Sequence, residues 1–415
     1  MKNLVILGAG TAGTMMANHL VKKLNKKDWQ ITLVDQFKSH YYQPGFLFIP
    51  FGTYQPEDVK RTIDEFLPKG IQLIREKIDR IDKDTDTVIL ENGRNVKYDI
   101  LIIATGCKIA PEEVPGMKGD TWQKNIFDFY TFEGSCALAK KLETWPGGKL
   151  VVHITEMPIK CPVAPLEFAF LADDYFTKKG MRDKVEISYV TPLSGAFTKE
   201  KCTKALEYLL KDKNIKIVPD FAVEHIEGEN GKMFDYGGEV VDFDLLVTVP
   251  TNMGDECILR SGFGDDLNYV PTDKNTLQSK VKENIFVIGD ATNVPASKAG
   301  SVAHFEAEIL TENILKYIEG KPLNPKFDGH ANCFIETGKG KALLIDFNYD
   351  VEPLKGKFPF AGIGPLNLLE ESAFNHFGKM AFKWVYWNML LPARKIPFVT
   401  PTMSRAGKKF DKETV

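Results

Sequence analysis

The chain has 415 residues, of which 43% are hydrophobic and 26% are charged, and its formal net charge at pH 7 is −3. This composition is ordinary for a folded protein with a sizeable core, and the length predicts two or three domains. The small negative charge excludes a globally basic nucleic-acid-binding protein. No apolar run approaches the roughly 20 residues that a membrane-spanning helix needs, so we expect no transmembrane helix.

The chain opens with a predicted strand, a glycine-rich turn and a helix. Residues 4–7 are apolar, residues 8–13 read GAGTAG, and a helix over 14–23 and a second strand over 31–34 follow. This is the dinucleotide-binding fingerprint in its expected context, with Asp35 placed to accept hydrogen bonds from a ribose. The predicted nucleotide-binding residues here are Gly8, Gly10, Thr11, Ala12, Gly13, Asp35 and Gln36.

Two later segments indicate which nucleotide binds. A predicted strand over 98–104 ends in Ala104-Thr105-Gly106, and another over 284–288 ends in Gly289-Asp290. In these features the chain resembles, over essentially its whole length, the flavoproteins with two dinucleotide-binding domains. The resemblance implies an FAD domain that is split in sequence, with Asp290 at the ribityl chain. It also implies a helix starting near residue 300 that points its N-terminus at the flavin.

The predicted fold class is α/β, with two Rossmann-like dinucleotide-binding domains and a C-terminal amphipathic membrane-binding segment. We assign residues 1–120 and 276–330 to the FAD domain and residues 121–275 to a second, degenerate NAD-type domain. Residues 331–415 form the C-terminal region.

The second predicted glycine-rich turn lacks glycine. Residues 155–162 read TEMPIKCP between a strand over 150–154 and a helix from about residue 165, and the next strand ends in Thr191-Pro192. Side chains in this turn would keep phosphates away, so a pyridine nucleotide is not expected to bind.

Cys161 lies in that turn, just before the predicted helix. The helix N-terminus favours a thiolate and the flanking prolines stiffen the turn, whereas the alternative is a buried structural cysteine. The segment CPVAPLE resembles that of sulfide:quinone oxidoreductases and of the flavoprotein subunit of flavocytochrome c sulfide dehydrogenases. The resemblance implies that Cys161 and Cys333 form a disulfide or polysulfide bridge beside the flavin.

The implied chemistry is thiol exchange. Hydrosulfide attacks the bridge, one cysteine becomes a persulfide, and the other passes two electrons to the flavin. Cys161 is the preferred persulfide carrier, although the reverse assignment stays open. Glu167 is a candidate general base or, equally, a first-turn helix acid.

The other cysteines are given lesser roles. None of the six forms a CxxC motif, and no metal site is expected. Many quinone-linked relatives carry a third cysteine near residues 129–133, where this chain has none. Either it is a two-cysteine type, which we prefer, or Cys136 substitutes. We interpret Cys107, Cys202 and Cys257 as structural.

Three features favour a quinone as the electron acceptor. The loop over 40–46 has no cysteine, so the FAD is expected to be non-covalent, and no signal peptide is seen. Residues 376–410 are aromatic and contain seven Lys or Arg but no Asp or Glu, which predicts an interfacial membrane anchor. The alternative is an ordinary docked helix. By position, Phe360 and Phe374 match the quinone-binding aromatics of relatives, and Lys298 is expected near the flavin or a quinone oxygen.

The leading hypothesis is therefore a sulfide:quinone oxidoreductase bound to one face of the cell membrane. Its expected partners are sulfide, a quinone and the membrane surface; no nucleic acid is expected, and self-association stays open. The alternatives are a type II NADH:quinone dehydrogenase, a flavocytochrome-type subunit, and a flavin-binding redox sensor without turnover.

Overall fold

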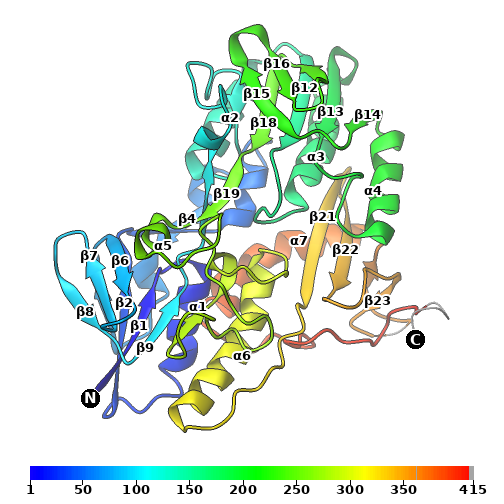
Figure 1. The fold of residues 1–415 in the computed structure, drawn as a ribbon. Coiled ribbons are helices and arrows are strands. Elements are labelled where there is room, and N and C mark those ends of the chain that lie inside the picture. Colours follow the sequence, from blue (N-terminus) through cyan, green and yellow to red (C-terminus); the bar gives the residue numbers. More distant parts are fainter. Residues whose placement is uncertain (361, 411–415) are drawn as a thin grey trace.

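The computed structural model describes residues 1–360 and 362–410, and its first parallel sheet is built from the apolar runs near the N-terminus (Figure 1). All of its neighbouring strands pair in parallel. The central strands bury both faces, as helix-covered parallel sheets do. In spatial order the strands are β20 (Ile285–Val287), β9 (Ile100–Ile103), β1 (Lys2–Leu7), β2 (Trp29–Val34) and β5 (Ile71–Ile74).

Helices α1 (Thr11–Leu20) and α6 (Gly300–Ile318) pack against each other beside this sheet (Figure 1). Helix α1 begins three residues before the predicted start, because Gly10 is already its N-cap. Strand β20, which comes from far along the chain, pairs with β9 at the edge of the sheet. Two separate segments therefore complete one sheet, and the predicted α/β class is confirmed.

A second five-stranded parallel sheet lies between these two segments in sequence. Its helices are α2 (Phe132–Thr144), α3 (Ala164–Lys178) and α4 (Glu200–Asp212). The antiparallel pair β10 (Cys107–Ala110) and β19 (Thr251–Gly254) joins the region of the first sheet to that of the second. In order, the strands are β11 (Ile126–Phe127), β18 (Leu245–Val249), β12 (Gly148–Ile154), β13 (Val185–Val190) and β14 (Ile215–Val218).

Small antiparallel sheets and a short helix decorate both regions. One sheet comprises β6 (Ile78–Asp82), β7 (Thr87–Leu90) and β8 (Asn95–Lys97), and helix α5 (Glu256–Ser261) packs on β6. Another comprises β15 (Val223–Glu227), β16 (Lys232–Asp235) and β17 (Val240–Asp242). A two-stranded sheet pairs β3 (Ser39–Tyr41) with β4 (Lys60–Thr62).

The C-terminal region forms a four-stranded sheet and a helix that close over the rest. The sheet has the order β21 (Ala331–Gly338), β22 (Lys341–Phe347), β24 (Leu366–Leu368) and β23 (Gly356–Phe358). Helix α7 (Ala373–Val385) continues into a π-helical turn, Tyr386–Leu390. One hydrophobic core runs through both parallel sheets, α3, α6 and β21. Within residues 1–360 and 362–410, no helix combines the length and the apolar character needed to cross a membrane.

The C-terminal segment differs from the expected basic face. Lys379 and Lys408 are buried in ion pairs, and Lys383 lies over the Tyr54 ring. These cations therefore dock the segment onto the protein instead of meeting lipid headgroups. The last five residues of the predicted 331–415 region, and residue 361, lie outside the described residues.

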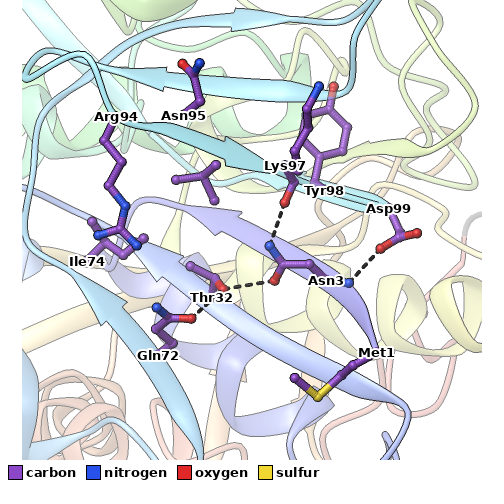
Figure 2. A pocket seen from close by; sticks show the side chains of 11 residues that line it. Met1, Asn3, Thr32, Gln72, Ile74, Arg94, Asn95, Lys97, Tyr98 and Asp99 are labelled. Atoms are coloured by element: carbon purple, nitrogen blue, oxygen red, sulfur yellow. Dashed lines mark hydrogen bonds between the residues drawn. The ribbon is translucent and has the colours of Figure 1, made fainter.

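A surface pocket of about 520 Å³ lies on the first sheet, away from the glycine turn (Figure 2). Asn3 at the start of β1 anchors it, donating to the Lys97 carbonyl oxygen at 2.6 Å and accepting from Thr32 at 2.9 Å. Ligands of parallel α/β sheets bind at the carboxyl ends of the strands. The functional site is therefore expected at the carboxyl ends of the strands of the first sheet, away from this pocket.

We predict that Gly13→Ala destabilises the protein by about 1–3 kcal/mol, whereas Gly10→Ala leaves the stability of the FAD-free protein unchanged. A Cβ atom on Gly13 would lie 1.8 Å from the Gly8 carbonyl oxygen, but one on Gly10 would meet no atom within 4 Å. Thermal unfolding of both FAD-free variants measures the difference. Equal melting temperatures would contradict the close packing of α1 on β1.

Candidate functional site

The glycine turn after β1 has the shape that a nucleotide pyrophosphate requires. Gly8 has φ +94°, and a Cβ there would lie 2.5 Å from the Ala104 carbonyl oxygen. Gly13 packs equally tightly, whereas the space around Gly10 is open. No side chain caps the N-terminus of α1, so its backbone N–H groups at Thr11 and Ala12 are free to donate to phosphates.

Two acidic residues flank this turn at the carboxyl ends of neighbouring strands. Asp35 follows β2 and accepts hydrogen bonds from the backbone N–H groups of Ala9 (2.6 Å) and Phe37 (2.7 Å), with exposed Gln36 beside it. Burial raises the pKa of Asp35 above its usual value. Asp290 follows β20, next to Gly289, whose φ is +69°.

The remaining predicted FAD residues line the same edge. The Thr105 hydroxyl is buried without a hydrogen-bond partner, and Gly106 has φ +71° with no neighbour within 4 Å of an added Cβ. Gly300, at the uncapped start of α6, is equally open. An open phosphate turn, two acids, two uncapped helix starts and an orphaned hydroxyl are the groups an extended dinucleotide uses. The residues present therefore fit FAD.

Lys298, which is expected near the flavin or a quinone oxygen, lies against the Asp290 segment. Its ammonium donates to the carbonyl oxygens of Asp290 (3.0 Å) and Thr292 (2.6 Å), and lies 4.0 Å from the centroid of the Tyr269 ring. Burial lowers its pKa. Its own carbonyl oxygen accepts from the Cys161 backbone N–H at 2.6 Å. Lys298 therefore braces the loop that joins the Asp290 segment to the cysteine turn.

The Cys161 turn is held in a strained conformation. Cys161 has φ +49°, in the left-handed region that non-glycine residues rarely adopt. The backbone N–H of Cys161 donates to the Lys298 carbonyl oxygen. The Cys161 carbonyl oxygen accepts hydrogen bonds from the Tyr130 hydroxyl (3.0 Å) and the Ala164 N–H (2.9 Å). Such strain persists only where surrounding contacts fix it, and it clusters at functional sites.

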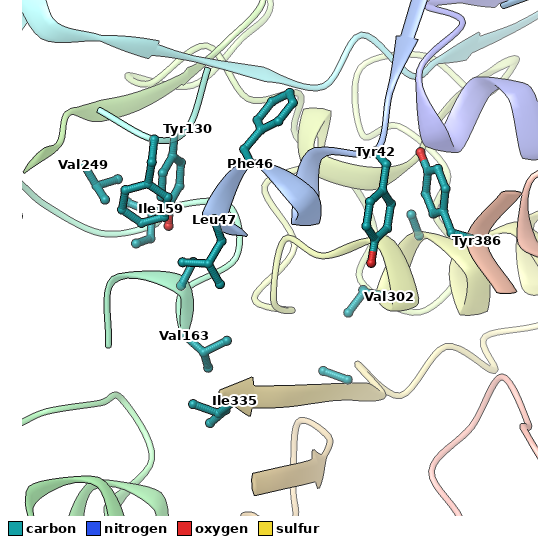
Figure 3. Packing of buried hydrophobic residues seen from close by; sticks show 14 of the residues in the cluster. Tyr42, Phe46, Leu47, Tyr130, Ile159, Val163, Val249, Val302, Ile335 and Tyr386 are labelled. Atoms are coloured by element: carbon teal, nitrogen blue, oxygen red, sulfur yellow. The ribbon is translucent and has the colours of Figure 1, made fainter. Parts of the chain in front are cut away.

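An apolar wall surrounds this turn. In Figure 3, Tyr130, Ile159 and Val249 lie together near Phe46 and Leu47, and Val163 lies above Ile335 of β21. Tyr42 and Tyr386 form an adjacent pair, with ring centroids 4.9 Å apart. The Tyr386 hydroxyl contacts His40 (2.7 Å) and Thr11 (2.6 Å) in the glycine turn. The wall therefore joins the cysteine turn, β21 and the nucleotide site. The residues of this apolar wall that Figure 3 labels are Tyr42, Phe46, Leu47, Tyr130, Ile159, Val163, Val249, Val302, Ile335 and Tyr386.

Cys161 and Cys333 face the same charged groups. Both are free thiols, and the charges of Glu167 and Lys379 act on both of them. Burial raises the pKa of Cys161 to about 12, and burial followed by the charge of Cys161 raises that of Cys333 further. The expected thiolate character from the helix N-terminus is therefore outweighed by desolvation, since α3 starts only at Ala164.

A buried ion pair lies beside the two thiols. The Lys379 ammonium contacts Glu167 Oε1 at 2.7 Å and the Phe334 carbonyl oxygen at 3.0 Å. The same Oε1 accepts from the Glu336 N–H at 2.8 Å, while Oε2 is buried without a partner. Burial alone would lower the pKa of Lys379, but Glu167, Cys161 and Glu336 together outweigh the effect of burial and the pKa is raised. The Lys379 ammonium is thus held charged, next to a carboxylate oxygen that has no hydrogen-bond partner.

Sequence reasoning missed Lys379 as a site residue and treated it as part of the basic membrane face. A usable signal was present in the spacing of α7. Residues 375, 379, 382 and 386 recur every three or four positions, and Asn375, Lys379 and Tyr386 are buried while Phe382 is half-buried.

The surroundings of the remaining predicted residues differ from one another. Phe360 and Phe374 are 48% and 64% exposed, and Phe360 packs edge-on against Phe398 with centroids 5.1 Å apart. The charges that act on Cys136 are those of Glu133, Lys140 and Glu57, and the two-cysteine interpretation stays a prediction. Cys107 lies 3.8 Å from an Asp290 oxygen, closer to the nucleotide site than its structural assignment implied.

We predict that Glu167→Gln and Lys379→Met each destabilise the protein by about 3–5 kcal/mol, because each leaves a buried charge without its partner. The double variant should recover most of that loss, since it removes both charges. Urea unfolding of the two single variants and the double variant gives the coupling energy. Additive losses would contradict a direct ion pair.

Comparisons with known proteins agree with this geometry. The family profile of the pyridine nucleotide-disulphide oxidoreductases matches residues 2–152. The chain is 28% identical over 400 residues to the mitochondrial sulfide:quinone oxidoreductase of Dictyostelium discoideum, covering 94% of this chain and 86% of the relative. It is also 28% identical over 385 residues to a type II NADH:quinone oxidoreductase of Staphylococcus aureus, covering 86% of this chain and 92% of the relative.

A solved structure extends the likeness to the fold. The sulfide:quinone oxidoreductase of the hyperthermophilic bacterium Aquifex aeolicus matches with a TM-score of 0.76 and 23% identity, over 94% of this chain and 92% of that one. At this identity the match establishes the mixed α/β architecture alone. The chain is thus similar in sequence to sulfide:quinone oxidoreductases over most of its length, and its residues 2–152 match the pyridine nucleotide-disulphide oxidoreductase profile.

Proposed function

We propose that the protein is an FAD-dependent sulfide:quinone oxidoreductase whose redox centre is the pair Cys161 and Cys333. The observation that carries the proposal is that Cys161, on the strained turn tied to the nucleotide edge, and Cys333, on β21, both lie within electrostatic reach of the buried Glu167–Lys379 ion pair. The sequence relatives named for sulfide and quinone support the substrates.

The two parallel sheets support the domain assignment. We assign residues 1–120 and 276–330 to the FAD domain, because the sheet completed by β20 carries the glycine turn, Asp35 and Asp290. Residues 121–275 form the second dinucleotide-type domain, which holds Cys161. The C-terminal region, from residue 331 onward, supplies Cys333 and Lys379. FAD is held without a covalent bond, by the residues at the carboxyl edge of the first sheet.

The chain's own residues account for the thiol chemistry. Hydrosulfide attacks the Cys161–Cys333 bridge, forming one S–S bond with Cys161 and breaking the other, so that Cys333 leaves as a thiolate. The Lys379 ammonium stabilises the negative charge on sulfur in this buried site, where such an interaction is weakly screened. The unpartnered Oε2 of Glu167 is available to accept the substrate proton. Bound FAD would supply the acceptor for the electron pair.

A pyridine nucleotide is the less favoured electron donor, although one relative is an NADH:quinone oxidoreductase. The segment between β12 and α3 contains no glycine, and Cys161 and Ile159 occupy it instead. A dinucleotide phosphate needs the close backbone approach that side chains deny. The cysteine turn therefore takes the place where NADH would bind.

The exposed face of α7 supports docking on a membrane surface. Phe374, Phe377 and Trp384 are 64%, 71% and 61% exposed, and they lie on one face, opposite the buried Lys379 and Tyr386. Exposed aromatics on an amphipathic helix favour the lipid interface. We propose that Phe360 and Phe374 border the route by which a membrane quinone enters.

Cys161→Ser and Cys333→Ser are each expected to slow flavin reduction by sulfide on the order of 10³-fold or more, because the bridge cannot form. FAD content should stay unchanged, since neither thiol belongs to the nucleotide edge. Stopped-flow absorbance of the anaerobic variants measures the rate. Cys136→Ser is the matched control and should react like the parent protein. Near-parental rates in both site variants would sink the cysteine mechanism.

Replacing Phe374, Phe377 and Trp384 together by Ser should weaken binding to anionic liposomes about tenfold or more, because apolar area is lost from the lipid-facing side. The fold should survive, since all three are exposed. Liposome sedimentation gives the bound fraction. Tyr208→Ser is the control, an exposed aromatic on α4 that is 69% accessible. If both variants bind equally well, the membrane surface lies elsewhere.

A further inference from the structure

A second buried acid–base pair lies next to the ion pair beside the cysteines. Both carboxylate oxygens of Glu336, on β21, lie within hydrogen-bond distance of His376 Nδ1, at 2.9 and 3.0 Å. The Glu336 side chain is 2% exposed, whereas that of His376 is 35% exposed. The pair therefore runs from the protein interior to solvent.

The edge of β21 connects this pair to the cysteine site. Strand residues alternate between faces, so Cys333 and Ile335 point to one side and Phe334 and Glu336 to the other. At the unpaired edge, the Glu336 N–H donates to Glu167 Oε1 and the Phe334 carbonyl oxygen accepts from Lys379. The Glu167–Lys379 pair thus lies along the edge of β21 that carries Cys333 on one face and Glu336 on the other.

Helix α7 aligns the two pairs from the other side. His376 and Lys379 are three residues apart and lie on adjacent turns of the same helix face. Lys379 and Glu167 both influence the charge of the Glu336 carboxylate. The four groups form a sequence from the thiols outward: Glu167, Lys379, Glu336 and His376.

We propose that Glu336 and His376 form the route by which protons pass between the cysteine site and solvent. The inference rests on the proposed sulfide oxidation. Conversion of hydrosulfide to sulfane sulfur releases one proton and two electrons for each sulfur atom. The electrons leave through the flavin to the quinone, so the proton needs its own exit from a site closed by apolar side chains.

The proton step can be written at named atoms. Attack of hydrosulfide on the bridge leaves a protonated persulfide on Cys161. Its S–H bond breaks and an O–H bond forms at Glu167 Oε2, with no change in oxidation state. The proton then moves to the Glu336 carboxylate, and His376 exchanges it with water. Glu167 regains its charge beside Lys379, ready for the next turnover.

The surroundings of Glu336 suit this role. Burial raises the pKa of Glu336 to about 7, partly offset by His376 and Lys379 of α7, while Glu167 of α3 adds to the rise. Tyr54 also lies within its electrostatic reach. A carboxyl group with a pKa near the working pH can both take up and release a proton. Below about pH 7 it is already protonated and cannot accept another.

The test compares Glu336→Gln, Glu336→Asp and parent enzyme, each loaded with FAD, in stopped-flow reduction by sulfide between pH 5.5 and 8.5, a range of about three pH units around the group's pKa. Rates are expressed per concentration of hydrosulfide, so that ionisation of the substrate does not contribute. We expect Glu336→Gln to be at least about tenfold slower and to lose the acidic limb near pH 7. Glu336→Asp should keep that limb, and added imidazole buffer should restore the rate of the Gln variant.

Infrared titration of the oxidised protein supplies a readout independent of turnover. The parent should show a carboxyl band with a midpoint near pH 7 that is missing in Glu336→Gln. Asp346→Asn is the matched control, because Asp346, a buried acid on β22, also pairs with a histidine, His330, and has Lys408 as its second partner; it should retain the acidic limb and show no imidazole response. If sulfide reduces the parent enzyme, but Glu336→Gln keeps the parental pH profile and does not respond to imidazole, the proton route is wrong and the proposed function stands. A parent that sulfide does not reduce would instead overturn the proposed function.

Discussion

The buried contact between Glu167 and Lys379 is the constraint on which the arrangement of the site depends. It joins the first turn of α3, the free edge of β21 and the inner face of α7 at a single carboxylate oxygen. Desolvation makes an isolated charge at this depth costly, so neither residue is tolerated there without the other. The same contact brings Cys161, which precedes α3, toward Cys333 on β21. The ion pair and the proposed redox pair of cysteines therefore share one site, and the C-terminal helix is part of that site.

The nucleotide edge and the cysteine site are mechanically connected. The Cys161 N–H bonds to the Lys298 carbonyl oxygen, and the Lys298 ammonium holds the loop that carries Asp290. On the other side, the Tyr386 hydroxyl reaches Thr11 in the glycine turn. Each end of the site is therefore fixed by residues distant in sequence. Binding of FAD at the carboxyl edge of the first sheet would be felt at the cysteine turn through these contacts.

Local sequence signals predicted much of this arrangement, and the misses share one cause. The glycine pattern of residues 8–13 was enough to predict the turn between β1 and α1, because the close packing at Gly8 and Gly13 excludes any side chain. The family resemblance of the CPVAPLE segment pointed to Cys161 and implied Cys333 as the second cysteine, and the redox role of both stays a prediction. The roles of Lys379, Glu336 and His376 depend on how α7 docks against β21, which composition does not encode. A lysine in a basic, aromatic segment looks like a lipid-facing residue until its partner, 212 positions earlier, is known. The depressed thiol pKa expected for Cys161 failed for the same reason, since enclosure by distant segments outweighs the helix N-terminus.

The central claim is that sulfide electrons enter the flavin through the cysteine pair and leave to a quinone. Anaerobic mixing of the FAD-loaded protein with sulfide, followed by addition of a short-chain quinone, tests it most directly. The account predicts rapid bleaching of the flavin absorbance and then re-oxidation with sustained turnover. A flavin that ignores sulfide but is bleached by NADH would contradict it and would assign the protein to the NADH-oxidising relatives instead.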